Sequence, residues 1–248
     1  MSDKKVLALG FFDAIHLGHT ALLRSAGELA RSLDADAAVV TFDIHPDTLV
    51  YGRGVPLLNT PAERAELIGR LSGIREIITL AFTPGLMQLP WERFLASLSS
   101  ERNAAGFVVG RDFRFGRGGE GDCEKLAAWC SERGLSSRVI DEVTLECEVV
   151  SSTLLRSLLS RGEIEEAVSY LGHPYLRMAE AQTGLIPADP RLVTLPDGVY
   201  LASITLPDGS RLENARILVR SGALQLPRAV SGSVHIAFFA RQRSEATP

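Results

Sequence analysis

The sequence predicts an α/β fold in which a mostly parallel sheet is covered by helices, followed by a small antiparallel β unit. Short apolar runs of strand length alternate along the first part with segments whose apolar residues recur every three or four positions. From about Val193 onward the pattern becomes strand-like, with turn residues between the runs. We therefore expect two domains, residues 1–181 and 182–248, with residues 182–190 as the linker.

The first domain is expected to hold five strands and four helices. The strands are 6–9, 37–41, 76–80, 107–109 and 137–140. The helices are 20–32, 62–71, 90–98 and 124–132. Parallel sheets bind ligands beyond the carboxyl ends of their strands, so the residues that follow 6–9 and 107–109 should line a site.

Two more helices and three strands complete the predicted elements. The helices cover 153–160 and 164–171, with Ser152 or Thr153 as the N-cap and Gly162 between them. The strands of the antiparallel unit are 198–204, 211–219 and 233–239. A Pro-Asp-Gly turn at 207–209 joins the first two of these strands.

The composition argues against several classes of function. With 46% hydrophobic and 23% charged residues, the chain can build an ordinary globular core. A net charge of −4 argues against general nucleic-acid binding, and the apolar run 6–9 is too short for a signal peptide or membrane span. The three cysteines form no CxxC pair, so free thiols are expected, with Cys123 and Cys130 buried on one helix face. We expect a cytoplasmic protein with no nucleic-acid or membrane partner.

The stretch from Gly10 to His19, GFFDAIHLGH, lies where the first strand passes into the first helix. A helix start offers unpaired N–H groups and a partial positive charge, which suit a phosphate. Gly18 lets the phosphate approach closely, because glycine has no Cβ. His16 and His19 can then donate hydrogen bonds to charge that builds on a nucleoside triphosphate. The alternative is that two histidines merely flank a helix start.

Three further segments carry candidate chemistry. Residues 109–122 interleave glycines, arginines and aromatics, which indicates a flexible loop able to close over an aromatic anion, or else a solvated turn. Residues 151–156 place hydroxyls and Arg156 at a helix start, where they can hold phosphate oxygens. Taken alone, an ordinary N-cap with a surface arginine explains that segment better. Residues 41–46 follow the second strand, and a structural turn explains them as well as an acceptor site does.

Residues 10–19 resemble the signature of the HxGH nucleotidyltransferases, which implies a Rossmann-like domain. With residues 109–122, 151–156 and 171–175, the chain from about 5 to 175 resembles the FMN adenylyltransferase (FAD synthetase) module of the bacterial bifunctional riboflavin kinase/FAD synthetase family. Ala14 departs from this pattern by replacing a usual glycine, and His173 by replacing a usual arginine. The matching positions are Gly10, Phe12, Asp13, His16, Gly18, His19, Gly110, Asp112, Phe113, Phe115, Gly116, Ser152, Thr153 and Arg156.

The resemblance implies the reaction FMN + ATP → FAD + pyrophosphate. The Mg²⁺ ion would accompany ATP and bridge phosphate oxygens, with few protein ligands of its own, and no residue is assigned as a metal ligand. His16, His19 and Arg156 would be the catalytic residues. The implied ATP-binding residues are Gly10, Phe12, Asp13, Gly18, Asp112, Ser152 and Thr153. The implied FMN-binding residues are Phe42, His45, Phe113 and Arg114.

The C-terminal part departs more from that family. The kinase module carries a Pro-Thr-Ala-Asn motif, which is missing between Tyr175 and Val199, and Ser233 stands where the family places its catalytic glutamate. Because a serine cannot act as a carboxylate base, residues 182–248 are expected to form a degenerate riboflavin-kinase-like β domain.

Other functions remain open at this stage. One alternative is a nucleotidyltransferase for another phosphorylated acceptor, and a second is a catalytically silent flavin- or nucleotide-binding regulatory protein. A retained bifunctional enzyme would need a kinase site built from residues that the family pattern does not include.

Overall fold

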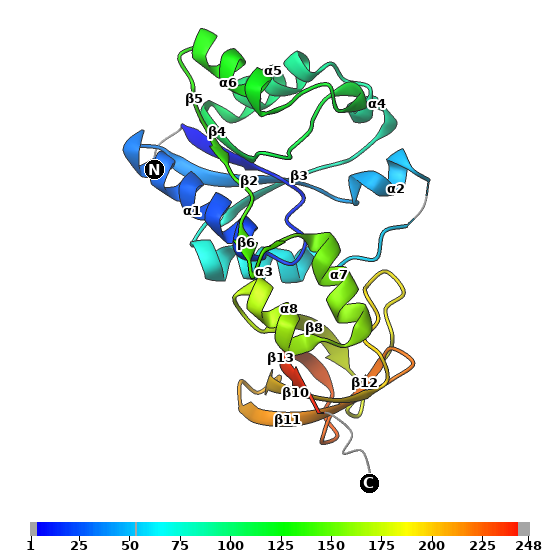
Figure 1. Ribbon diagram of the computed structural model, residues 1–248. Helices are drawn as coiled ribbons and strands as arrows, with labels where there is room; N and C mark the ends of the chain where they lie inside the picture. The colour runs from blue at the N-terminus through cyan, green and yellow to red at the C-terminus, as the bar shows by residue number, and fades with distance from the viewer. Residues whose placement is uncertain (1–3, 53, 243–248) are drawn as a thin grey trace. The chain divides into compact units, whose positions relative to one another are not determined.

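The computed structural model describes residues 4–52 and 54–242, which belong to two compact units (Figure 1). The first unit comprises Met1–Val55 and Ala65–Val149, and the second comprises Pro56–Arg64 and Val150–Pro248. This division differs from the boundary expected after residue 181. Two helices and a strand that precede this boundary belong to the second unit, because they pack with the C-terminal strands.

The first unit contains a five-stranded parallel sheet in the order β3-β2-β1-β4-β5. Its strands are β1 (Lys5–Leu9), β2 (Asp36–Phe42), β3 (Glu76–Leu80), β4 (Ala104–Gly110) and β5 (Ser136–Ile140). All five were predicted, each with its ends within three residues of those observed. The chain winds outward from β1 through β2 to β3, then returns to β4 on the other side of β1. The carboxyl ends of β1 and β4 therefore flank the point at which the strand order reverses, where such sheets bind ligands.

Helices bury both faces of this sheet. The helix α1 (Leu17–Ser32) contacts β1, β2, β4 and β5, while α5 (Trp91–Arg102) and α6 (Cys123–Glu132) cover the opposite face (Figure 1). Leu7 and Leu9 face the layer formed by α5 and α6. There they belong to one buried apolar cluster with Leu95 and Trp129. Because β1 is covered on both faces, its side chains from Val6 onward are at most 1% exposed.

Several short elements were not predicted. They are α2 (Pro46–Val50), α4 (Pro84–Met87), the 3₁₀ turn η1 (Arg117–Gly119) and the hairpin of β6 (Thr144–Leu145) and β7 (Glu148–Val149). None is longer than five residues, so none is long enough for its apolar pattern to repeat detectably. The predicted helix 62–71 is confirmed as α3 (Pro61–Ser72).

Two helices open the C-terminal part of the second unit, α7 (Ser152–Arg161) and α8 (Ile164–Leu171). Gly162 ends α7 with φ +76°, as its position between the helices predicted. The expected N-cap was wrong by one residue. Ser151 is the cap, because its backbone is extended and its hydroxyl accepts a hydrogen bond of 3.2 Å from the Leu154 N–H.

The second sheet is antiparallel, in the order β8-β13-β10-β11-β12-β9. Its strands are β8 (Tyr175–Ala181), β9 (Leu185–Ile186), β10 (Gly198–Thr205), β11 (Arg211–Arg220), β12 (Ala223–Gln225) and β13 (Gly232–Arg241). β10, β11 and β13 confirm the predicted strands. The linker expected at 182–190 is wrong, because β9 lies inside it.

The six strands close on themselves. β8 and β9 occupy opposite edges of the sheet, yet only four residue steps separate Ala181 from Leu185, a reach of at most about 14 Å. A flat sheet of six strands would separate its edges by about 24 Å. The sheet must therefore curl into a barrel, whose interior holds Tyr200, Ile217 and Phe238, all 0% exposed.

A segment from far upstream completes the second unit. Leu57 forms a parallel bridge with Leu192, and its N–H and carbonyl bond to Arg191 and Val193 at 2.9 Å each. The Tyr175 hydroxyl donates a hydrogen bond of 2.7 Å to the Leu58 carbonyl. Residues 56–64 are thus held by the same kind of backbone pairing that holds the barrel strands.

No helix within residues 4–52 and 54–242 has the length and apolar character to cross a membrane. All three cysteines lie in this described part and are free thiols. The burial expected for Cys130 is confirmed at 0% exposure, whereas Cys123 is half-buried and Cys147 is exposed.

Candidate active site

The motif of residues 10–19 occupies the turn between β1 and α1, beside the reversal of strand order. Three residues in this turn have positive φ without being glycine: Phe12 at 59°, Ala14 at 72° and Ile15 at 40°. Each is at most 1% exposed, so the strained backbone is enclosed by the protein. Such conformations cost on the order of 1–3 kcal/mol each and cluster at functional sites. The φ of Ala14 also explains why a glycine suits this position.

The strained turn is tied to the neighbouring strand β2. The Thr41 hydroxyl donates a hydrogen bond of 2.9 Å to the Phe11 carbonyl, and the Gly10 N–H donates one of 3.2 Å to the Val40 carbonyl. Thr41 is itself only 5% exposed. These two bonds hold the start of the turn at the edge of the sheet.

The two histidines form a stacked pair at the start of α1. His16 is the N-cap, and its Nδ1 accepts a long hydrogen bond of 3.4 Å from the His19 N–H. The two rings lie 3.7 Å apart between centroids at an angle of 18°. Because its Nδ1 accepts this bond, neutral His16 carries its ring proton on Nε2. The sequence prediction that both histidines lie at a helix start is confirmed.

The first turn of α1 suits an anion. It contains no acidic residue, so no carboxylate there offsets the positive end of the helix dipole. Gly18 is half-buried in the same turn. Backbone N–H groups at such a terminus can bind phosphate oxygens without a special side chain.

The residues at the end of β2 and just after it mostly make local structural contacts. Phe42 is 8% exposed and packs edge-on against Phe82, with ring centroids 5.1 Å apart. His45 caps α2 by accepting the Asp47 N–H at 3.2 Å, and its ring lies 4.7 Å from that of Phe11. Among the residues expected near the flavin, Phe42 therefore belongs to the core and His45 to the partly exposed edge.

The loop expected to be flexible, residues 109–122, is pinned to the core. Phe115 is 6% exposed, stacks on Phe113 at 5.7 Å, and pairs through its backbone with Gly121. A Cβ on Gly121 would lie 2.5 Å from the Phe115 ring, and one on Gly116 would lie 2.5 Å from the Trp91 Cβ. These glycines therefore permit close packing, which is a different use from the flexibility that the sequence predicted.

The polar residues of this loop remain at the surface. Asp112 is exposed, and its Oδ1 lies so close to Gly110 that a Cβ there would be 2.8 Å away. Arg114 is also exposed and pairs at 3.4 Å with Asp122, the N-cap of α6. Asp112 and Arg114 thus both lie beyond the carboxyl end of β4.

The other predicted phosphate-binding residues lie in the second unit. Ser152 and Thr153 form the first turn of α7, half-buried and exposed respectively. The Arg156 Nε donates a hydrogen bond of 2.9 Å to the Pro56 carbonyl. The guanidinium of Arg156 is therefore fixed to the segment 56–64.

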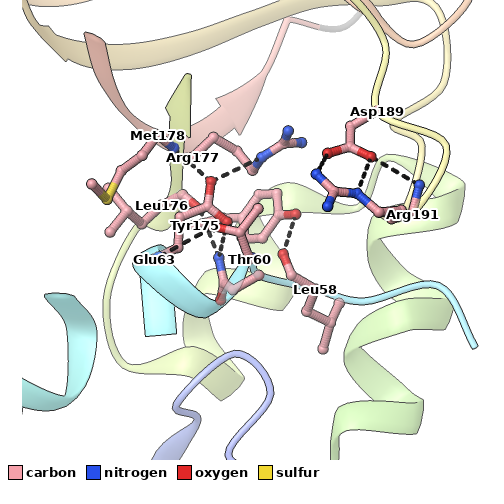
Figure 2. Close-up of polar contacts among 10 residues, drawn as sticks. Leu58, Thr60, Glu63, Tyr175, Leu176, Arg177, Met178, Asp189 and Arg191 are labelled. Carbon is pink, nitrogen blue, oxygen red and sulfur yellow. Dashed lines mark hydrogen bonds and ion pairs between the residues drawn. The ribbon is translucent and has the colours of Figure 1, made fainter. Parts of the chain in front are cut away.

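A buried polar network in the second unit, shown in Figure 2, was not predicted from the sequence. The Glu63 carboxylate, 0% exposed, accepts hydrogen bonds from the N–H groups of Thr60 at 2.7 Å and Met178 at 2.6 Å. It also pairs with the Arg177 Nε at 3.3 Å, while the Asn59 amide donates to the Leu176 carbonyl at 2.8 Å. The pattern Thr-Pro-Ala-Glu before an apolar run is a capping box and could have revealed part of it.

Two forces act on the arginine of this network. Burial lowers the pKa of Arg177, but the neighbouring Tyr175 and Glu63 outweigh burial and leave the pKa above its ordinary value. Arg177 therefore stays charged opposite Glu63. Nearby, Asp189 and Arg191 form a second ion pair at 2.7 Å (Figure 2).

Comparison with known proteins adds independent findings. A model of the FAD synthetase family matches residues 1–154. A bifunctional riboflavin kinase/FMN adenylyltransferase of Listeria monocytogenes is 33% identical over 173 residues, which cover 69% of this chain and 54% of that protein. A protein of the same organism named FAD synthetase is 27% identical over 179 residues, which cover 70% of this chain and 71% of that protein.

The chain also resembles an Escherichia coli bifunctional riboflavin kinase/FMN adenylyltransferase, with 31% identity over 68% of this chain and 55% of that protein. It thus spans about half the length of the bifunctional relatives described here. A solved structure described as a macrolide-efflux protein from Streptococcus pneumoniae matches with a TM-score of 0.86, covering 100% of this chain and 88% of that one. At 22% identity, that match shows the fold alone.

Proposed function

The chain belongs to the FAD synthetase family, and from this membership we propose that it is an FMN adenylyltransferase, which transfers AMP from ATP to FMN and releases pyrophosphate. One observation supports the proposal most directly. The rings of His16 and His19 stack at the start of α1, beside the reversal of strand order, with no carboxylate in the first helical turn. This arrangement suits the phosphates of a nucleotide.

The proposed reaction makes few chemical demands on the protein. The nucleophile is an oxygen of the FMN phosphate, which is already ionised at neutral pH because its second pKa is about 6. This oxygen forms a bond to the α-phosphorus of ATP, the bond from that phosphorus to the bridging oxygen breaks, and pyrophosphate leaves. No general base or covalent intermediate is required, so catalysis consists of positioning and of stabilising charge.

We assign His16 and His19 to the α-phosphate and the leaving pyrophosphate, toward which their ring N–H groups would donate. Ser152, Thr153 and Arg156 are assigned to the β- and γ-phosphates, with Arg156 supplying a planar cationic group. Mg²⁺ enters as part of the MgATP substrate, and it neutralises phosphate charge.

The remaining assignments follow from where each residue lies. Phe12 and Asp13 are each 1% exposed, so we assign to them the shape of the turn that borders ATP and no direct side-chain contact with it. Gly10, Gly18 and Asp112 lie at or near the exposed edge of the turn and loop. The proposed flavin-side residues are Phe42, His45, Phe113 and Arg114.

We further propose that the second unit has lost riboflavin kinase activity. Ser233, at the position where the family has its catalytic glutamate, lies in β13 directly opposite Glu180 of β8. Ser233 has no carboxylate with which to accept a proton from the riboflavin hydroxyl. The barrel would then serve a structural purpose.

The test is chromatography of flavins after incubation of the purified protein with MgATP and either FMN or riboflavin. We expect FAD from FMN and unchanged riboflavin. FMN or FAD made from riboflavin would overturn the proposed loss of kinase activity. No product from FMN would overturn the adenylyltransferase proposal, and a competition series with other phosphorylated acceptors, together with flavin binding followed by fluorescence, would then separate another acceptor from a binding role.

A further inference from the structure

We propose that Phe12 is a positioning residue that holds the His19 imidazole in its stack on His16. The inference deepens the proposed function and rests on it, because it concerns the same site. Phe12 would act through His19, without touching the reacting phosphates by its side chain. Its backbone conformation, its burial and its ring contacts support this inference independently of one another.

The Phe12 ring centroid lies 5.2 Å from that of His19, at an angle of 55°. The His19 ring in turn stacks on His16 at 3.7 Å. Aromatic rings at such separations attract each other beyond the gain from burial alone. The three rings therefore form a continuous contact from the protein interior to the start of α1.

The Phe12 ring is itself held on another side by the backbone. An ideal Cβ built on Gly10 would lie 3.0 Å from two atoms of the Phe12 ring, Cε2 and Cζ. Any side chain at position 10 would thus require this ring to shift by a few tenths of an ångström. The glycine at the start of the motif has a local reason, which is to admit the Phe12 ring.

The backbone of Phe12 supports the same conclusion. A bulky aromatic residue rarely adopts a φ of +59°, and glycine or asparagine would do so more readily. The preceding residue, Phe11, faces a different neighbour, because its ring packs edge-on against His45. The left-handed conformation at Phe12 therefore directs its ring toward Gly10 and His19.

In the proposed reaction, the Phe12 ring should matter for the rate of turnover and little for the binding of ATP. Backbone N–H groups at the start of α1 can bind the phosphates of ATP whether or not His19 is well oriented. Charge on the transition state is stabilised only by donors that already point to it. Loss of the Phe12 ring should consequently lower kcat while leaving KM for ATP nearly unchanged.

The test compares Phe12→Leu with Phe107→Leu. Phe107 is a matched control, because it is a buried phenylalanine of the same unit, 0% exposed in β4, and packs edge-on against Trp129. For Phe12→Leu we expect kcat to fall about tenfold or more, with KM for ATP changed less than threefold. For Phe107→Leu we expect kcat within twofold of the unmodified protein. Circular dichroism and thermal melting would show that both variants fold.

Nuclear magnetic resonance of the histidine side chains gives a readout that needs no turnover. We expect a nuclear Overhauser effect between the Phe12 and His19 rings in the unmodified protein. The His19 ring signals should shift in Phe12→Leu, because a ring current is lost, and stay in place in Phe107→Leu. Absence of the Overhauser effect, or unmoved His19 signals in Phe12→Leu, would overturn the inference even if FAD is made. Unchanged kcat in Phe12→Leu would overturn it too.

The experiments distinguish failure of the proposed adenylyltransferase function from failure of the proposed role of Phe12. If the unmodified protein makes no FAD, the proposed function fails, and the magnetic resonance data alone decide whether Phe12 orients His19. If FAD is made but Phe12→Leu and Phe107→Leu lose kcat equally, Phe12 contributes only to the core. Should Phe12→Leu fail to fold, the Overhauser effect in the unmodified protein still decides whether the rings are in contact.

Discussion

The Thr41 hydroxyl donates its hydrogen bond to the Phe11 carbonyl, and this single contact joins the end of β2 to the strained turn after β1. The bond is sheltered from water, since Thr41 is 5% exposed. It lies directly before Phe12, whose ring contacts His19. The hydrogen bond made by Thr41 of β2 therefore bears on the orientation of His19, which follows β1.

Replacing Thr41 by valine removes this bond with little change of shape. We expect Thr41→Val to cost roughly 1–3 kcal/mol, because the carbonyl of the half-buried Phe11 loses a donor. FAD synthesis should also slow, and a thermal melt alongside steady-state kinetics measures both effects. The control is Thr79→Val, since Thr79 lies directly opposite Thr41 in β3 but is exposed. If Thr79→Val is as harmful as Thr41→Val, the bond has no special importance.

Two substitutions of His16 separate its capping from its proposed catalytic part. Asparagine is a good N-cap, so His16→Asn should keep the stability of the protein while kcat falls. His16→Ala should lose both, with a destabilisation of about 1 kcal/mol. Parallel melts and kinetics make the comparison. Full activity in His16→Asn would show that the imidazole only caps the helix.

The role of His19 is tested by His19→Ala, for which we expect kcat to fall roughly tenfold to a thousandfold, as when one oxyanion donor is removed. His235→Ala is the matched control, because His235 is another half-buried histidine and lies on β13, among the barrel strands. Turnover near normal in His19→Ala would refute the assignment.

Glu63 should be the most sensitive charged residue of the second unit. Glu63→Gln leaves Arg177 opposite an amide and weakens two backbone hydrogen bonds, and breaking a buried pair in this way costs about 3–5 kcal/mol. Chemical denaturation would measure the loss. Glu66→Gln, on the exposed side of the same helix, should change stability little. Equal effects at the two positions would contradict the importance of the network.

The thiols should react in the order of their burial. Burial raises the pKa of Cys130 to about 11, so at pH 8 this thiol is protonated as well as shielded. Iodoacetamide followed by peptide mapping should label Cys147 first and Cys130 only after unfolding. Because the unfolded thiol ionises near its ordinary pKa of 9.0, stability should also decline as pH rises from about 9 toward 11. Rapid native labelling of Cys130 would contradict this burial.

The parallel sheet could be predicted because its strands and helices are long enough to show their periods. Strands of two or three residues, such as β9 and β12, are too short to repeat the two-residue period of a strand, and these two strands close the barrel. The boundary was misplaced for a related reason. β8 reads YLRMAEA, a sequence without clear alternation, so its place in the second sheet depends on pairing with β13, which is distant along the chain.

Some features of the candidate site could be predicted from the sequence and others could not, and the reasons are physical. The cap formed by His16 follows from local sequence, because a helix start needs an acceptor for its N–H groups. The tight packing of residues 109–122 could not be predicted. Glycine occurs both where the backbone is flexible and where another group packs closely against it, and the sequence does not distinguish the two. Only neighbours that are remote in sequence, such as Trp91 beside Gly116, reveal which of the two applies.

The position of residues 56–64 has a consequence for biosynthesis. These residues leave the ribosome early, but their partners around Tyr175 and Leu192 emerge more than a hundred residues later. Domains generally fold as units during translation, in the order in which they are made. The sheet of β1 to β5 can therefore assemble while Asn59 and Glu63 still await the strand that buries them. During that interval the Glu63 carboxylate lacks the Met178 N–H and the Arg177 guanidinium that β8 supplies, and the segment becomes fixed only when β8 has been synthesised.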